Sequence, residues 1–264
     1  ACYAASNTDD GIHAATTENL SCIACTTLDN GGDGVYLLTT VGVTLLGCGI
    51  RRSIVGASSV LKGIVTSGAA TTSIVSCYID RIGTAIELAG SSSDTTITSC
   101  YLSGETGLYV NGATEVRAVS NFIQGNSGPA ISLANGVSRS TFTNNFIWPF
   151  STYGIGVADN TTDVDIINNI FYSGTSVQVN IDGAATARVR VTGNRFQSVR
   201  TGVYVVNGVG ITIDNNDIFA AQNYGIRVAA SPQYLAIRNN FIYQGQDYGI
   251  NIYGSDGAVV QGNV

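Results

Sequence analysis

The chain has 264 residues, 12 basic and 18 acidic side chains and a net charge of −6, and charged residues make up only 11% of it. It contains no basic patch or stripe, which argues against nucleic acid as a partner. It also contains no apolar run close to the roughly 20 residues that a membrane-spanning helix needs, so we expect no membrane segment. One long repeat domain fits this length as well as two average domains do.

One sequence design recurs along the whole chain. In residues 235–242, alternating apolar and polar residues meet an Asn-Asn pair and continue as a short apolar run, and residues 211–218 and 164–171 repeat this order. In the first part of the chain a Cys stands where the second Asn stands later. These anchor residues are about 24 residues apart on average, which is the signature of a repeat architecture. The anchors are Cys2, Cys25, Cys48, Cys77, Cys100, Asn121, Asn145, Asn169, Asn194, Asn216, Asn240 and Asn263.

Each repeat carries a second landmark, a small residue followed by an apolar-x-apolar triplet. Gly107–Val110 and Gly202–Val205 are examples, and turn dipeptides such as Asn111-Gly112 separate the landmarks. Period-two alternation in short β-branched runs predicts half-buried strands. We therefore predict three short strands per repeat, with successive repeats stacked at one strand spacing, about 4.8 Å. The expected fold class is all-β, with one domain over residues 1–264 that forms a parallel β-helix (a solenoid) of about 11 coils of about 24 residues.

The Gly-Ile-x-Val landmark followed by Val-x-Ile-x-Asn-Asn-x-Ile resembles right-handed parallel β-helices of the pectin-lyase-like superfamily, over essentially the whole chain. That superfamily includes pectate lyases, polygalacturonases, alginate epimerases, phage tailspikes and non-catalytic surface proteins. The resemblance therefore implies a right-handed coil but no single function. Tyr-Gly-Ile triplets at Tyr153, Tyr224 and Tyr248 are similar to the start of the alginate epimerase motif, but the Asp-Pro-His that should follow is absent. The polygalacturonase Gly-His-Gly is also absent, so neither chemistry is expected.

The two ends of the chain fall in the middle of repeats. The sequence begins without Met, and both Cys2 and Asn263 occupy anchor positions. An uncapped end coil of a solenoid exposes strand edges and core. We therefore expect this sequence to be a fragment or a processed part of a longer chain.

The six cysteines raise the question of metal or redox chemistry. Five of them are anchors, and Cys22 stands three residues before Cys25. This C-x-x-C has no second pair and no nearby His, whereas zinc sites combine such motifs. We interpret the cysteines as small buried thiols that replace Asn in the interior. Adjacent coils would also bring Cα atoms within the range of a disulfide, so the redox state stays open.

The strand after each landmark turns one side chain per coil outward, which gives a mixed aromatic, amide and charged face suited to sugars. Glu87 and Glu105 lie on neighbouring coils near this face. Paired carboxylates can hydrolyse glycosides, one as acid and the other as base or nucleophile. The alternative is a pair of solvated surface carboxylates. The predicted substrate-binding residues are Tyr109, Gln178, Tyr204, Arg227 and Asn251.

Calcium is the one cofactor that the sequence brings into consideration. Asp159, Asp163, Asp165 and Asp182 form an acidic group, and calcium binds carboxylate oxygens. Most of these residues stand at turns, where Asp is favoured for backbone reasons. We therefore predict neither a cofactor nor a metal site, with calcium at this acidic group as the alternative.

The short strand after each anchor carries an unusual outward row of aromatic side chains. A contiguous exposed apolar patch of this kind usually marks an interface. We therefore predict a homo-oligomer, with a trimer favoured, that associates through this row. The alternative is that the variable loops fold over the row and cover it. The predicted interface residues are Tyr78, Tyr101, Phe122, Phe146, Trp148, Tyr172, Phe241 and Tyr243.

Together these features predict an extracellular, cell-surface or virion-surface rod that binds polysaccharide, similar to a phage tailspike, with or without depolymerising it. Two alternatives stay open, a non-catalytic structural or adhesive surface protein and a secreted polysaccharide lyase or glycoside hydrolase. Acids, Lys and His are scarce in any one column, which favours binding or structure over catalysis. Because function resides in sites rather than in folds, the fold alone does not choose among these classes.

Overall fold

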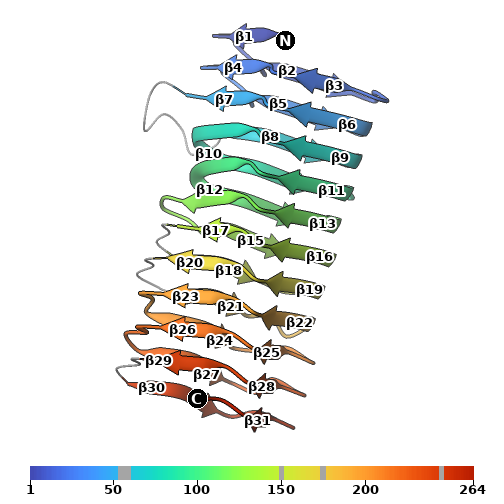
Figure 1. Cartoon of the computed structure of the whole chain (residues 1–264). Coiled ribbons are helices and arrows are strands. Elements are labelled where there is room, and N and C mark those ends of the chain that lie inside the picture. Colours follow the sequence, from blue (N-terminus) through green and yellow to red (C-terminus); the bar gives the residue numbers. More distant parts are fainter. Residues whose placement is uncertain (53–60, 149–151, 173–176, 244–246) are drawn as a thin grey trace.

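The computed structural model describes residues 1–52, 61–148, 152–172, 177–243 and 247–264. Its backbone winds into a rod of stacked coils with the two termini at opposite ends (Figure 1). The described residues form 31 strands and no helix, so no helix among them is long and apolar enough to cross a membrane. The predicted all-β solenoid with three strands per coil is confirmed.

Three rows of strands run along the rod, and every strand pairs in parallel with its copies in the coils above and below. The first row follows the anchors. It consists of β1 (Tyr3–Ala5), β4 (Thr26–Leu28), β7 (Gly49–Arg51), the first parts of β10 (Tyr78–Ala89) and β12 (Tyr101–Asn111), β14 (Phe122–Gly125), β17 (Phe146–Ile147), β20 (Ile170–Tyr172), β23 (Arg195–Gln197), β26 (Asp217–Phe219) and β29 (Phe241–Tyr243).

The second row follows the landmarks, and β10 and β12 continue into it from the first row without a break. Both rows therefore belong to one 20-stranded sheet. The second row consists of β2 (Ile12–Ala15), β5 (Val35–Leu38), β8 (Lys62–Ser67), the second parts of β10 and β12, β15 (Ile131–Ala134), β18 (Tyr153–Val157), β21 (Val177–Ile181), β24 (Thr201–Val205), β27 (Tyr224–Ala229) and β30 (Tyr248–Tyr253).

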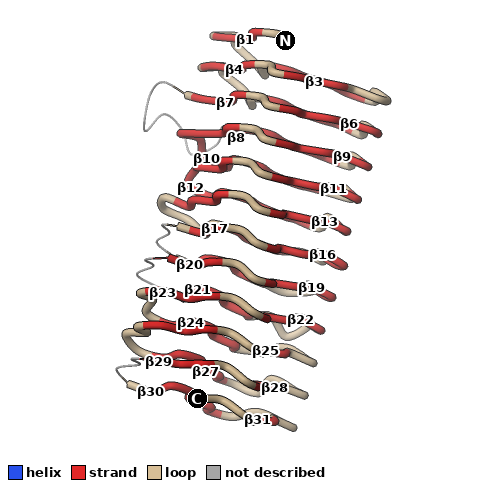
Figure 2. The backbone as a smooth tube through the Cα atoms, in the orientation of Figure 1, coloured by secondary structure: helices blue, strands red, loops and turns tan. Residues whose placement is uncertain are grey.

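The third row is a separate sheet of 11 strands. Figure 2 shows how short loops at the corners separate it from the other rows. It consists of β3 (Ser21–Ile23), β6 (Val41–Leu46), β9 (Ala70–Val75), β11 (Ser93–Thr98), β13 (Thr114–Val119), β16 (Ser138–Thr143), β19 (Thr162–Ile167), β22 (Ala187–Thr192), β25 (Thr212–Asp214), β28 (Ala236–Arg238) and β31 (Val259–Gln261).

The Asn-Asn pairs form the corner between the third and first rows. The first Asn of a pair adopts the left-handed backbone conformation, as at Asn144 (φ 55) and Asn168 (φ 53). Asn tolerates this conformation better than most residues because its short side chain can hydrogen-bond locally. The second Asn then points inward, and Asn145 and Asn169 are both almost fully buried.

The buried anchors form a continuous hydrogen-bonded ladder from Asn121 to Asn263. The Asn169 side-chain oxygen accepts hydrogen bonds from the backbone N–H of Asn145 at 2.9 Å and from the Asn145 amide at 3.0 Å. The Asn169 amide donates to the Phe142 carbonyl at 2.9 Å. The ladder therefore satisfies polar groups that burial would otherwise leave unpaired.

The cysteine anchors reproduce this pattern with thiols. Cys100 donates from Sγ to the Ile74 carbonyl at 3.5 Å and accepts the backbone N–H of Cys77 at 3.4 Å. All six cysteines are free, and burial raises the pKa of Cys22 to about 11, so this thiol stays protonated at neutral pH. Cys2, on the end coil, is exposed. The interpretation of the other thiols as buried replacements for Asn agrees with this geometry.

Candidate functional site

The outward residues of the second row form one unbroken column, which we call the polar column. Strand register aligns Tyr109 with Ser132, Ser132 with Gly156 and Gly156 with Asn180. The alternation within each strand places these residues on the outer side of the sheet while their neighbours fill the core. Two members of the column, Val65 and Asn180, are nevertheless buried. Over the whole rod the polar column is His13, Tyr36, Val65, Glu87, Tyr109, Ser132, Gly156, Asn180, Tyr204, Arg227 and Asn251.

The middle of the polar column is hollowed. A pocket of about 410 Å³ opens there, where Ser132 and Gly156 leave little side-chain volume. A Cβ at Gly156 would lie 3.4 Å from the nearest atom, which belongs to the Tyr153 ring, so this ring forms one edge of the hollow. The lining combines an aromatic ring with amide and carboxylate groups and consists of Pro129, Ser132, Thr152, Tyr153, Gly156, Val157, Ala158, Asn180 and Asp182.

Tyrosines flank the hollow along the column. Tyr109 lies two coils before Gly156 and Tyr204 lies two coils after it. One coil further, the Arg227 guanidinium lies 5.1 Å from the ring centroid of Tyr204 and 5.0 Å from that of Tyr224. These distances are within the range of cation–π attraction. The predicted binding residues Tyr109, Tyr204, Arg227 and Asn251 therefore do share one face.

Gln178 is the exception, and its predicted outward position is wrong. Its side chain is fully buried, because Gln178 occupies the position that Gly154 holds in the preceding coil. Neither amide atom of Gln178 has a hydrogen-bond partner among the described residues. The outward residue of this coil is Asn180, two positions later. The apolar-x-apolar triplet Val179–Ile181 could have identified Asn180 as the outward residue. Because this coil has Gln178 in place of the small landmark residue, the sequence pattern aligns with the triplet two residues earlier.

The predicted carboxylate pair is not brought together. Glu87 aligns with Tyr109, so Glu105 lies four residues away along the neighbouring strand. Four residues of extended chain span about 13 Å, whereas the carboxyl groups of glycosidases lie about 5 to 9.5 Å apart. Glu87 is also paired with Lys62, with Oε2 and Nζ 2.9 Å apart. This arrangement does not support the acid and base roles expected for Glu87 and Glu105.

The acidic group considered for calcium is also divided. Asp165 accepts hydrogen bonds from Arg190 at 2.9 and 2.7 Å, and Asp163 accepts from Arg188, which lowers the pKa of the Asp163 carboxyl. Asp182 instead lies at the hollow of the second row. Among the described residues, no three His, Cys, Asp or Glu side chains form a group that could hold a metal ion. The acidic group is thus not assembled into a calcium site.

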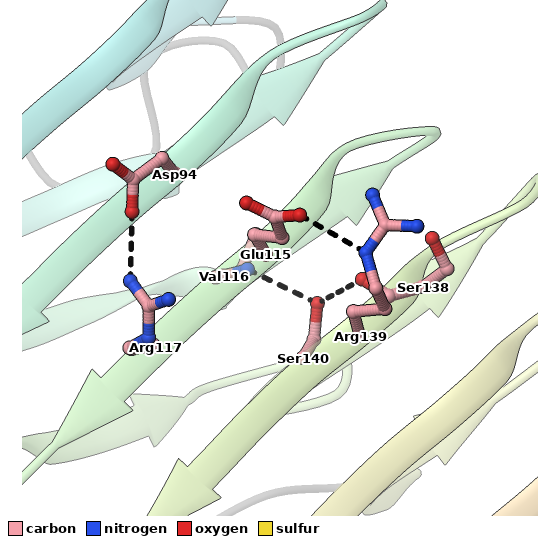
Figure 3. A network of polar contacts seen from close by, with 7 residues as sticks. All are labelled: Asp94, Glu115, Val116, Arg117, Ser138, Arg139 and Ser140. Atoms are coloured by element: carbon pink, nitrogen blue, oxygen red, sulfur yellow. Dashed lines mark hydrogen bonds and ion pairs between the residues drawn. The ribbon is translucent and has the colours of Figure 1, made fainter.

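Most outward arginines of the third row pair with an acidic residue of the neighbouring coil. Arg117 donates to Asp94 at 2.7 Å and Arg139 donates to Glu115 at 3.0 Å, as Figure 3 shows. In the same view, the Ser140 hydroxyl accepts the backbone N–H of Val116 and donates to the Ser138 carbonyl. Exposed pairs of this kind contribute little to stability, about 0–1 kcal/mol each. Because these charges already have partners, the third row offers fewer free groups to a ligand than the polar column.

The aromatic residues of the first row form a stacked column. The ring centroids of Tyr78 and Tyr101 are 4.7 Å apart, those of Tyr101 and Phe122 are 5.1 Å apart, and those of Phe122 and Phe146 are 5.4 Å apart. Interplanar angles of 7 to 15° make the rings nearly parallel. We call these four residues the aromatic column. The other expected interface residues, Trp148, Tyr172, Phe241 and Tyr243, are exposed on the same row.

Comparison with known proteins supports the assignment of the fold. The model of the family described as the right-handed beta helix region matches residues 62–196 and 177–264. The chain belongs to this right-handed β-helix family. The handedness implied by the resemblance is thereby confirmed. No curated protein sequence matches this β-helix.

Solved structures similar to this β-helix share its fold at low sequence identity. The periplasmic alginate epimerase AlgG matches with a TM-score of 0.67 and 13% identity, over 96% of this chain and 76% of that protein. The Azotobacter vinelandii mannuronan C-5 epimerase AlgE4 A-module matches with a TM-score of 0.66 and 14% identity, over 97% and 79%. The Dettilon tailspike protein matches with a TM-score of 0.63 and 15% identity, over 94% of this chain but only 61% of the tailspike.

Proposed function

We propose that this β-helix binds polysaccharide along the polar column, with one sugar unit seated in the hollow at Gly156. The observation that carries this proposal is the hollow itself, because an amide, a carboxylate and the Tyr153 ring converge on about 410 Å³ of open space. Binding sites typically combine an apolar or aromatic surface with a few placed polar groups. A sugar ring matches such a lining, since its C–H faces pack on aromatic rings and its hydroxyls bond amides and carboxylates.

The shape of the column favours a polymer over a small molecule. Tyr109 and Tyr204 lie two coils on either side of the hollow, so the aromatic and polar groups extend over several coils at about 4.8 Å per coil. The similar structures include two alginate epimerases and a tailspike. This supports an extracellular, cell-surface or virion-surface rod of tailspike type. The proposal is for binding, because Glu87 and Glu105 do not form a carboxylate pair on this face.

Filling the hollow should weaken glycan binding. The nearest atom to a Cβ at Gly156 would belong to the Tyr153 ring, at 3.4 Å, so Gly156→Phe should occupy the hollow without disturbing the core. We expect its Kd for a bound polysaccharide to rise at least about tenfold, which corresponds to about 1.4 kcal/mol. Affinity electrophoresis against a panel of polysaccharides, followed by calorimetry on those that retard the protein, would measure this.

The matched control for this experiment is Ser73→Phe, which adds the same side chain to the outward face of the third row. Its Kd should stay at the wild-type value. Equal binding by wild type, Gly156→Phe and Ser73→Phe would show that the glycan lies elsewhere. Failure of the wild type to bind any acidic or neutral glycan would leave the non-catalytic structural or adhesive protein as the better assignment.

We also propose that copies of the chain associate through the aromatic column. The rings of Tyr101 and Phe122 are each covered on both faces by their neighbours in the stack, so the column presents ring edges outward. A sugar packs on a ring face rather than an edge, which makes this column less suited to glycan than the polar column. An apolar protein surface can pack against ring edges. The alternative is that the variable loops cover the aromatic row. Some of these loop residues, 149–151, 173–176 and 244–246, lie outside the described residues.

The double substitution Phe122→Ser/Phe146→Ser should dissociate the oligomer, for which we favour a trimer. Both residues lie in the middle of the aromatic column and contact each other, so their loss interrupts the apolar surface. Sedimentation velocity of the wild type and the variant would measure the change in mass. A wild type that sediments as a monomer at all concentrations would contradict the proposed association.

A further inference from the structure

Arg227 differs from the paired arginines of the rod because it has no acidic partner. No carboxylate in the described part of the chain lies within 4.0 Å of its guanidinium, and none of its N–H groups has a hydrogen-bond partner there. By contrast, Arg117, Arg139, Arg188 and Arg190 of the third row engage Asp or Glu. Arg227 is instead half-buried between two tyrosine rings. A positive charge that is held in place without a counter-charge is a candidate for binding an anion.

The local backbone explains why Tyr224 and Arg227 share a face. Gly225 and Ile226 are both buried, so two consecutive inward residues break the alternation of β27. A Cβ at Gly225 would come within 2.5 Å of Ile242 and 2.6 Å of the Gly249 carbonyl, so only glycine fits there. The residues on either side, Tyr224 and Arg227, therefore both point outward, and the preceding coil supplies Tyr204.

The two rings orient the guanidinium and leave its donors available. Each ring attracts the cation through its face, while the N–H groups lie in the guanidinium plane and form a rigid fork that matches carboxylates and sulfates. Because the side chain is already held, less conformational entropy is lost when an anion binds. Lys would offer a point charge without this fork.

The position of Arg227 connects it to the hollow. Three coil steps separate Gly156 from Arg227, about 14 Å along the rod. A polymer that lies in the hollow and follows the polar column therefore passes over Arg227. Asp182 lies at the hollow itself, so an anionic sugar group is favoured at Arg227 and disfavoured beside Asp182.

We propose that Arg227 makes the polar column selective for glycans that carry an anionic group, a carboxylate or a sulfate ester, over neutral glycans. This inference rests on the proposed polysaccharide binding along the same column. The net charge of −6 disfavours non-specific adsorption of polyanions. Selectivity for an anionic glycan would therefore have to come from a local cation such as Arg227.

The test compares three polymers, alginate as a polyuronate, dextran sulfate as a sulfated glycan and dextran as a neutral one. We expect the wild type to bind at least one of the two anionic polymers ten times or more tightly than dextran, and the stronger of the two identifies the anionic group. Arg227→Gln should remove this preference, and Arg227→Lys should keep part of it because the charge remains without the fork. The matched control Arg117→Gln removes an exposed arginine of the third row and should retain the preference.

The outcomes separate this inference from the function on which it rests. Equal affinity for dextran and both anionic polymers, with Gly156→Phe still weakening all three, would overturn the selectivity of Arg227 and leave polysaccharide binding intact. A preference that survives Arg227→Gln would also overturn it. Absence of binding to every polymer would overturn both proposals. Circular dichroism of each variant would verify that the fold is retained.

Discussion

Replacing Asn169 by Leu should destabilise the rod by about 3–5 kcal/mol, because the substitution leaves buried polar groups without partners. The backbone N–H of Asn145 loses its acceptor and the Phe142 carbonyl loses its donor. Leu has the same branched side-chain skeleton as Asn and is larger, so the substitution opens no cavity and the loss comes from hydrogen bonding. The midpoint and slope of urea denaturation, followed by circular dichroism, would give the change in the free energy of unfolding.

The control for this substitution is Asn126→Ala. Asn126 is exposed and accepts a single hydrogen bond from Gln124. Exposed substitutions of this kind usually change stability by less than about 0.5 kcal/mol. A loss below about 1 kcal/mol for Asn169→Leu would mean that the ladder contributes little beyond filling space.

Phe171→Ala should destabilise the rod by a similar amount, about 3–5 kcal/mol, through a cavity in the core. Phe171 is fully buried and stacks on Phe196 with ring centroids 4.7 Å apart. A Cβ at Gly154 would lie only 2.9 Å from the Phe171 ring, so the backbone of the neighbouring coil packs tightly against it. Thermal unfolding and urea denaturation of the variant would measure the loss.

The matched comparison is Tyr253→Ala, which also removes an aromatic ring but from a side chain that is 81% exposed. We expect it to change stability by less than about 0.5 kcal/mol. If the two substitutions cost the same, the interior stack would not be the source of the stabilisation. A Phe171→Ala loss well under 2 kcal/mol would mean that the coils close up around the vacated space.

The first part of the rod uses Cys anchors and the second part uses Asn anchors to hydrogen-bond the buried backbone at the same corner. In both, an inward anchor donates to a carbonyl of the preceding coil and accepts its backbone N–H. The thiol is a weak donor and acceptor, which agrees with its longer contacts of 3.4 and 3.5 Å at Cys100. The amide adds a side-chain hydrogen bond from one anchor to the next, as from Asn145 to Asn169 at 3.0 Å, so the Asn part of the ladder is the more strongly connected.

The repeat pattern of the sequence is enough to predict the coil, its three strands and the inward anchors. Equivalent residues recur in every coil, so the inward position of a residue such as Asn169 or Ile237 is indicated by many copies. A single coil that deviates from the pattern therefore does not obscure the prediction. The outward columns followed from the same alternation. This is why Tyr204, Arg227 and the aromatic column were placed on the correct rows.

The sequence pattern does not predict how individual outward groups combine, because that depends on contacts between coils. Gln178 replaces the small landmark residue, so the sequence allows two alignments of its coil. Strand pairing selects the one that buries Gln178 in the core and places Asn180 at the hollow. The pairing of Glu87 with Lys62 and the clamping of Arg227 join residues from adjacent coils. The hollow at Gly156 arises from small side chains on successive coils and a ring beside them. These features depend on contacts between coils, and a repeat fixes the spacing of its coils without fixing which side chains meet.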